Sequence, residues 1–275
     1  MRLSGSRCAR SRCSRDHCVN VAQLADPTLF YLLATLAVLL AGFSKASAAG
    51  GVGLMAVPLM SIAIAPQHAA AIMLPILCVL DLLGLWTYRR QYDLRLLRQL
   101  IPGALIGVLV GALVFKTVDV RWVKGLLGAE CLIFAAHRIL ATRRLAAAAG
   151  SRQNLAKASF WSAISGFTST LAHAGGPPIL QYLLPLKLDK TLLVATTVYF
   201  FTAVNYIKLV PYAWLGLLES ANLGTSLLLA PVIPLGYWIG WKFTSMVPEK
   251  PFYFFINLSL LATGIKLLWD GLTGG

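Results

Sequence analysis

A helix-breaking step between two apolar runs constrains the fold more than any other feature. The sequence Leu-Ala-His-Ala-Gly-Gly-Pro-Pro, residues 171–178, lies between apolar runs at 160–168 and 179–186. Each run is shorter than the roughly 20 residues that a helix needs to cross a bilayer. Glycine is conformationally loose and proline lacks an N–H, so an α-helix cannot continue through this step. In lipid, the unpaired backbone groups of a break are tolerated only where they pack in protein or line a cavity.

A second step of the same kind occurs earlier in the chain, at residues 42–51. Its Gly42-Phe43 corresponds to Gly166-Phe167, and its Ala-Ala-Gly-Gly end corresponds to Ala174-Gly175-Gly176. Two interrupted helices at matching places in two halves are typical of the binding site of a transporter.

The correspondence between the halves extends beyond the two breaks. A proline followed by Gly-x-x-x-Gly occurs at 102–111 and again, with the same intervals, at 231–240. Small residues four apart let helix backbones approach closely in lipid, where hydrophobic burial does not drive association. One such motif is common in membrane helices, but the pair, each copy following a Gly-Gly break, supports an internal repeat.

The composition places the chain in a membrane. It is 58 % hydrophobic and 12 % charged, and a soluble domain carries about twice that charged fraction. The apolar stretches have helical length and do not alternate as the strands of a β-barrel do. We therefore predict an all-α polytopic membrane protein of about eight transmembrane helices, in two related four-span halves with broken or re-entrant helices.

The predicted organisation has four parts. Residues 1–27 form a basic, disordered head, 28–142 the first transmembrane repeat, 143–157 a cytoplasmic linker and 158–271 the second transmembrane repeat. The apolar pattern predicts helical pieces in the first half at 28–43, 52–65, 67–88, 100–115 and 122–140. In the second half it predicts the broken segment 160–186 and spans at 191–210, 221–243 and 252–269.

The chain has a net charge of +14, and its basic residues are not spread evenly. They concentrate at 1–20, 89–98 and 138–157, each beside a predicted span, which is how cytoplasmic loops look under the positive-inside rule. This distribution argues against nucleic-acid binding. Four lysines of the second half would then face the opposite side unless the halves are inverted, and the sequence leaves this open: Lys187, Lys190, Lys242 and Lys250.

The Arg-rich head also contains Cys8, Cys13 and Cys18 together with His17. Their spacing fits no standard zinc pattern, so we expect no metal site there. No part of the sequence indicates a cofactor.

The two breaks and the paired motifs resemble the TauE/SafE family, the sulfite exporter family of membrane transporters. The resemblance rests on 42–51 with Pro58, on 166–178 with Pro185, and on the paired Pro-Gly-x-x-x-Gly helices, and it covers about residues 29–269. It implies a multi-pass protein of the bacterial inner (cell) membrane that moves small anions, often sulfur oxyanions or organosulfonates. The head lies outside the family pattern.

Lys45 is the only charged residue in the first break. A lysine at membrane depth is energetically expensive and usually functional. A half-helix that begins near Gly51 would offer N–H groups and a positive dipole end to an anion, and Ser44 and Ser47 would add hydroxyl donors. The alternative is that Lys45 extends to a membrane interface.

His173 takes the corresponding place in the second break. It could donate a hydrogen bond to an anion or carry a coupled proton, because its reference pKa lies near neutral pH. The alternative is a neutral histidine packed against exposed backbone carbonyls. The breaks themselves would line the site with backbone, through Gly50, Gly51, Gly175, Gly176 and Pro177.

The span after the second break contains Asn205, Tyr206 and Lys208. Asn205 is a candidate to complete the pocket. For Lys208 we favour a place at the membrane interface.

Two acidic residues are further candidates for proton coupling. Asp81 lies shortly before the end of its span and could instead pair with a nearby arginine. Glu130 lies seven residues before His137, on one helix face, and could instead pack against the linker arginines.

The sequence has no phosphate-binding loop for ATP and no recognisable catalytic motif. We therefore expect a secondary transporter of small anions rather than an enzyme, in contact with membrane lipid, with the oligomeric state open. The alternatives are an ion channel, a non-transporting membrane assembly factor and, less favoured, an intramembrane enzyme.

Overall fold

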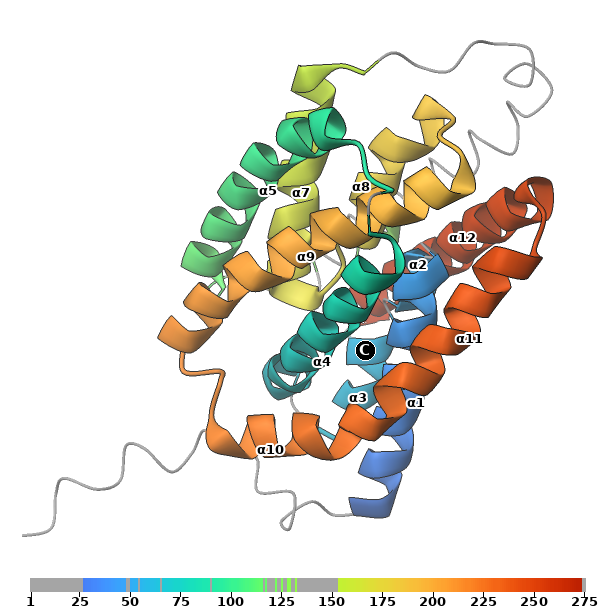
Figure 1. Ribbon diagram of the computed structural model, residues 1–275. Coiled ribbons are helices and arrows are strands. Elements are labelled where there is room, and N and C mark those ends of the chain that lie inside the picture. The colour runs from blue at the N-terminus through green and yellow to red at the C-terminus, as the bar shows by residue number, and fades with distance from the viewer. Residues whose placement is uncertain are drawn as a thin grey trace, which may run out of the picture.

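The computed structural model describes residues 27–47, 50–53, 55–64, 66–89, 91–115, 117, 122, 125, 128–129, 132 and 153–273. Within these ranges the chain is helical and contains no strand (Figure 1). Among the described residues, five helical segments are long and apolar enough to cross a membrane: 27–47, 67–87, 94–114, 190–214 and 220–246. The prediction of an all-α membrane protein is confirmed, and the predicted count of eight spans stays a prediction.

The first helix, α1 (Pro27–Ser47), is longer than predicted. The sequence predicted an end at Phe43, with Lys45 inside the break. Because Ser-Lys-Ala-Ser contains no helix breaker, the helix continues and Lys45 lies in its last turn. The hydroxyl of Ser47 donates to the carbonyl of Phe43 at 2.7 Å, within the same turn.

Two short helices follow α1, where the sequence predicted one apolar piece at 52–65. They are α2 (Gly50–Gly53) and α3 (Ala56–Ser61). The full span α4 (Pro66–Thr87) comes next, close to its predicted bounds, and contains Pro75.

Helix α5 (Leu94–Val114) begins six residues before the predicted start at residue 100. Asp93 caps it, accepting from the N–H groups of Arg95 at 2.8 Å and Leu96 at 3.2 Å. This N-cap satisfies two backbone donors that a helix start leaves unpaired, so the helix extends into a polar segment that the apolar pattern did not include.

The second break lies where the sequence predicted it. Helix α7 (Leu155–Ala172) ends at His173, whose φ of 51° is left-handed. Helix α8 (Gly176–Leu183) begins with two prolines in its first turn, where a missing N–H does no harm. The chain then turns back along α7. The end of α8 returns to the start of α7, where the backbone N–H of the N-cap Asn154 donates to the hydroxyl of Tyr182 at 3.4 Å.

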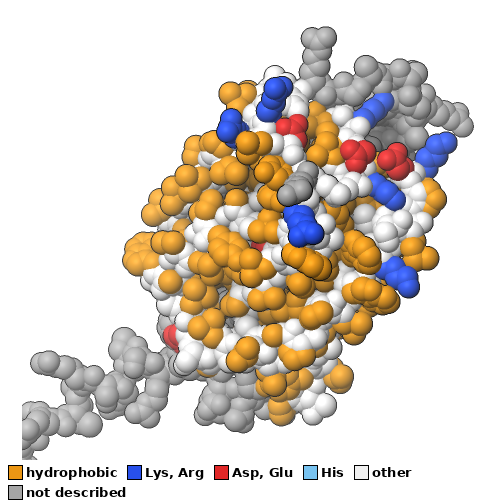
Figure 2. Space-filling model, viewed as in Figure 1, with side chains coloured by type: hydrophobic (Ala, Val, Ile, Leu, Met, Phe, Trp, Pro, Cys, Tyr) orange, Lys and Arg blue, Asp and Glu red, His pale blue; other side chains and the backbone are white. Residues whose placement is uncertain are grey.

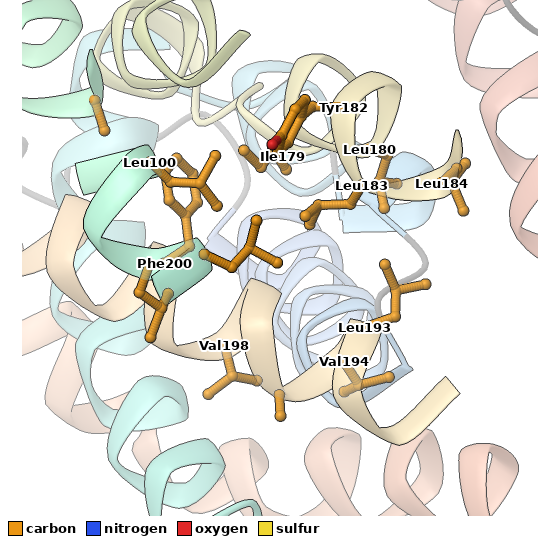
Figure 3. Close-up of a cluster of buried hydrophobic side chains, with 14 of the residues drawn as sticks. Leu100, Ile179, Leu180, Tyr182, Leu183, Leu184, Leu193, Val194, Val198 and Phe200 are labelled. Carbon is orange, nitrogen blue, oxygen red and sulfur yellow. The ribbon is translucent and has the colours of Figure 1, made fainter. Parts of the chain in front are cut away.

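After α8 come η2 (Leu184–Leu186) and α9 (Lys190–Trp214), which covers the predicted span 191–210. The predicted span 221–243 is divided into α10 (Ser220–Leu229), η3 (Ala230–Val232) and α11 (Ile233–Met246). The last helix, α12 (Glu249–Thr273), contains the segment predicted at 252–269, whose crossing of the membrane stays a prediction. Figure 3 shows the buried cluster that α5, α8 and α9 share, with Leu100 from α5, Leu183 from α8 and Val198 from α9 among its members. This cluster connects the returning helix α8 with its neighbours in the bundle.

One face of α5 consists of small residues and the other of large apolar ones. Gly103, Gly107 and Gly111 are buried, whereas Ile106 and Leu113 are 60 % and 73 % exposed. A helix that turns its glycines inward and its large apolar side chains outward is typical of a helix packed in lipid.

The buried glycines of α5 lie directly on the backbone of α7. A Cβ on Gly107 would lie 1.9 Å from the carbonyl oxygen of Ala163, and one on Gly111 would lie 3.2 Å from that of Phe167. At Gly107 the two helices therefore touch backbone to backbone, as the Gly-x-x-x-Gly motif predicted, and at Gly111 the side chain of Thr170 is also in contact.

The same contacts occur between α11 and α1. A Cβ on Gly236 would lie 2.8 Å from the carbonyl oxygen of Leu39, and one on Gly240 would lie 2.4 Å from that of Phe43. Leu39 precedes Phe43 by the interval at which Ala163 precedes Phe167. The paired glycine motifs therefore contact corresponding positions of the two broken segments.

Helices α4 and α9 meet in the middle of the bundle (Figure 1). Their contact joins Asp81 to Asn205. Asp81 follows Pro66, the first residue of α4, by the interval at which Asn205 follows Lys190, the first residue of α9. The two helices thus touch at equivalent positions.

The starts of α5, α7 and α9 lie at one end of the bundle, whereas α1 runs in the direction opposite to α7 (Figure 1). Gln99 near the start of α5 contacts Gln153 at 3.3 Å, and Lys190 at the start of α9 donates to two carbonyls at the end of α11. Figure 2 shows most charged side chains of the visible face at this end, with hydrophobic ones over the rest. The basic residues at the starts of α5 and α9 therefore share one side.

The contact of α5 with α7 can be tested by adding a single methyl group. In Gly107→Ala the new Cβ meets the backbone of Ala163, so the helices must separate and we expect the free energy of unfolding to fall by ~1–3 kcal/mol. Thermal unfolding of the protein in detergent measures this change. The matched control is Gly224→Ala in α10, where a Cβ meets nothing within 4 Å. Equal stability of the two variants would contradict the close packing.

Candidate functional site

A cavity of about 80 Å³ lies between the two broken segments. Each water needs roughly 10–15 Å³ on this scale, so the cavity has room for a small anion or a few waters. Its wall is largely apolar and comes from α1, α2, α3, α4, α7, α8 and α9. The polar groups of the wall are few: Ser44, Lys45, Ser169, His173, Thr197 and Asn205.

Lys45 is held inside the protein by an ion pair. Its Nζ contacts Oδ1 of Asp81, and the two side chains are 12 % and 0 % exposed. The Nζ also lies 5.1 Å from the centre of the Phe201 ring, within the range of a cation–π contact. The alternative of an extension to the interface does not describe this geometry, and the partner of Asp81 is Lys45 rather than an arginine.

Asn205 completes this contact from α9. Its Nδ2 donates to Oδ2 of Asp81 at 2.7 Å, so both carboxylate oxygens are engaged. Lys45 and Asn205 line the cavity, and Asp81 lies behind them. The predicted pocket residues Lys45 and Asn205 are thus brought together through a carboxylate.

Lys208 is fully buried, so the predicted place at the membrane interface is wrong. Its Nζ contacts three acceptors: the carbonyl of Ser169 at 3.1 Å, its hydroxyl at 3.0 Å and Nδ1 of His173 at 3.0 Å. An ammonium has three donors, which match these contacts. Because Ser169 lies in the last turn of α7, the helix dipole also favours a cation there.

His173 is fixed by partners on both ring nitrogens. Nε2 lies 3.0 Å from the carbonyl of Ala70 in α4. A carbonyl only accepts, so Nε2 carries the hydrogen and Nδ1 is the acceptor for Lys208. This arrangement is a neutral imidazole against a backbone carbonyl, as the alternative interpretation of the sequence had it, and the ring also lines the cavity.

Basic side chains outnumber carboxylates around the cavity. Among the described residues, the lysines Lys45 and Lys208 stand against the single carboxylate of Asp81, and His173 is neutral. Charges inside a membrane protein are expensive unless a ligand or partner compensates them, so this excess of basic groups favours an anion in the cavity.

Some of the other predicted site residues line the cavity and others do not. Ser44 and Gly176 line it, whereas the Ser47 hydroxyl is directed to its own helix. Gly50 and Gly51 form the start of α2, and the last residue of this helix, Gly53, lines the cavity.

Close packing explains the second glycine pair. A Cβ on Gly175 would lie 2.7 Å from the carbonyl oxygen of Ser165, so the turn requires glycine there. Pro177 is buried in the first turn of α8. Because Pro177 and Pro178 have no N–H, the first turn of α8 offers fewer donors to an anion than the sequence analysis expected.

The site predicted from the sequence and the observed wall of the cavity differ in two ways. Glu130 and His137 lie outside the described residues. Wall residues that were not among the sequence candidates include Phe201, which lies one helical turn before Asn205, and Thr197, one turn before that. Their spacing puts them on one face of α9, which is the signal that could have found them.

The contact between Lys208 and His173 predicts a measurable coupling. Lys208→Met leaves the buried Nδ1 of His173 without its donor, so we expect the free energy of unfolding to fall by ~1–3 kcal/mol. Combined with His173→Ala, the loss should be smaller than the sum of the single losses. Thermal unfolding in detergent gives all three values, and Lys242→Met, at an exposed lysine, is the control. Additive losses would contradict the contact.

Comparison with known proteins confirms the resemblance found in the sequence. The profile of the family described as sulfite exporter TauE/SafE matches residues 34–267. No curated protein and no solved structure gives a significant match. Because the family match covers most of the chain, the protein belongs to the TauE/SafE sulfite exporter family, whose members are membrane transporters of sulfur-containing anions.

Proposed function

We propose that this protein is a secondary transporter of a small anion and that the anion binds in the cavity beside Lys45. The observation that carries this proposal is that two lysines, Lys45 and Lys208, stand against one carboxylate, that of Asp81, among the described residues around the cavity. An entering anion places a negative charge beside these lysines. The substrate class, a sulfur oxyanion or an organosulfonate, follows from the family.

The cavity has features that suit a sulfur oxyanion and features that suit an organosulfonate. The Lys45 ammonium and the Asn205 amide are donors for the oxygens of an anionic group. The surrounding wall, with Met73, Leu77 and Phe201, is apolar and suits a small organic substituent. Among the described residues the wall contains no carboxylate, which favours anions over cations.

We further propose that the chain consists of two inverted halves of four spans each, which makes eight spans. The equivalent glycine contacts of α5 with α7 and of α11 with α1, and the opposite directions of α1 and α7, support this arrangement. Its charged end faces the cytoplasm of a bacterial inner membrane, by the positive-inside rule. A homo-oligomer remains a prediction from the sequence.

The proposed topology predicts which cysteines a membrane-impermeant thiol reagent labels. In a variant without the native cysteines, Arg95→Cys in the first turn of α5 and Lys187→Cys just before α9 should be labelled only after the cells are opened. Ser220→Cys, at the start of α10 and the opposite end, should be labelled in intact cells. Labelling of Lys187→Cys but not of Arg95→Cys from outside would contradict inverted halves.

The proposed binding site predicts the effect of Lys45. Proteoliposome uptake is measured for sulfite, thiosulfate, methanesulfonate and acetate. Lys45→Gln removes one charge-assisted hydrogen bond, which is worth ~1.5–3 kcal/mol, so the apparent affinity should fall about tenfold or more. Lys45→Ala with Asp81→Asn, which removes both charges of the pair, should show the same loss.

The matched control is Lys266→Ala, at a lysine of α12 paired with Asp270 four residues later. Its uptake should equal that of the wild type. Unchanged affinity in both Lys45 variants would place the site elsewhere, while transport of cations alone would overturn the function.

A further inference from the structure

Asp81 is the buried group that the binding of an anion would disturb most. Its Oδ1 contacts the Lys45 ammonium and its Oδ2 accepts from the Asn205 amide. The side chain is fully buried. An anion that binds Lys45 competes with Asp81 for the positive charge of the same ammonium.

We propose that Asp81 is the proton-binding group of the transporter and takes up one proton when an anion takes its place on Lys45. The inference rests on the proposed anion site and adds the coupling ion to it. It makes the protein a carrier of an anion together with a proton.

The cavity reaches Lys45 but not its carboxylate partner. Lys45 and Asn205 form part of the wall, while Asp81 does not. An anion in the cavity therefore approaches the ammonium without first passing Asp81. The Phe201 ring, 5.1 Å from the Lys45 Nζ, lies on the same wall and keeps the ammonium at the cavity.

Among the residues that the structure describes, Lys45 is the one cation in contact with Asp81. From α1 it faces Lys45, from α9 Asn205, Tyr206 and Lys208, from α11 Tyr237, and from its own helix Cys78. The ammonium of Lys208 is engaged with Ser169 and His173. The tyrosines and the thiol are neutral at neutral pH.

A carboxylate that loses its cation in this environment becomes neutral by taking up a proton. Burying an isolated ionised carboxylate is far more costly than burying the acid form. The amide of Asn205 still contacts Oδ2, so the protonated side chain keeps one partner. Binding of the anion and protonation of Asp81 are therefore linked.

The step balances in charge and atoms. The N–H···O contact of Lys45 with Asp81 breaks and re-forms with the anion, and an O–H bond forms on Asp81 with a proton from water. A monovalent anion that enters with one proton leaves the net charge of the group unchanged, and a dianion such as thiosulfate that enters with one proton lowers it by one. No oxidation or reduction takes place.

His173 is the other candidate for the proton, and its contacts argue against it. Nε2 already carries a hydrogen toward the carbonyl of Ala70, and Nδ1 accepts from the ammonium of Lys208. A second proton on Nδ1 would face a cation at hydrogen-bond distance. Anion binding at Lys45 changes neither partner.

The inference is tested by counting the protons that the purified protein takes up on binding an anion. Titration calorimetry with thiosulfate and with methanesulfonate is carried out in two buffers of different ionisation enthalpy at one pH. Neither anion titrates near neutral pH, whereas sulfite does, so any proton uptake belongs to the protein. We expect one proton per bound anion in the wild type and none in Asp81→Asn.

The pH dependence gives a second readout. If binding takes up one proton, the affinity of the wild type for the anion falls about tenfold for each unit by which the pH rises. The affinity of Asp81→Asn does not change with pH. Infrared difference spectra of the wild type on adding thiosulfate should show the carbonyl stretch of a protonated carboxylic acid. Asp81→Glu, which keeps an acid should the amide variant not fold, should retain the proton uptake.

The control is Asp270→Asn, at a buried carboxylate paired with Lys266 in α12, which should take up the wild-type number of protons. If the anions bind and the wild type takes up no proton, or Asp81→Asn takes up as many, the inference is overturned and the anion site stands. If neither these two anions nor sulfite nor acetate binds the wild type, the proposed function and the inference fall together.

Discussion

The structure depends on one constraint, which is that backbone carbonyls freed by a helix break inside a membrane must find donors within the protein. Each unsatisfied buried group costs about 1–3 kcal/mol. Around the end of α7 the donors are side chains from the same helix and from α9. The contacts join the Ser165 hydroxyl to Gly175 at 2.7 Å, the Thr168 hydroxyl to Ala174 at 3.1 Å, Lys208 to Ser169 at 3.1 Å and the Tyr212 hydroxyl to Thr170 at 2.9 Å.

This constraint explains which parts of the fold the sequence predicts. Glycine and proline act on the backbone within a few residues, so the break before Gly176 was predicted at its observed place. The end of α1 was predicted too early because an apolar pattern ends at Lys45 while the helix does not. The start of α5 was predicted too late because the Asp93 cap lies in a polar segment.

A site residue could be predicted where its type and its place in the sequence were unusual by themselves. A lone lysine at membrane depth identified Lys45, but its partner Asp81 comes from another helix, and the sequence favoured an arginine. Lys208 was assigned to the interface because its acceptors on α7 are brought to it only by the packing of α9. Contacts between distant segments of this kind require the tertiary arrangement.

The glycine contacts also have a mechanical consequence. In α5 with α7, and in α11 with α1, backbone lies on backbone at Gly107 and Gly236 with no flexible side chain between the helices. Such surfaces cannot slide past each other without collision, so each pair is expected to move as one rigid body. Helices α4 and α9 instead meet through side chains, Asp81 with Asn205, which can rearrange more easily when the cavity opens.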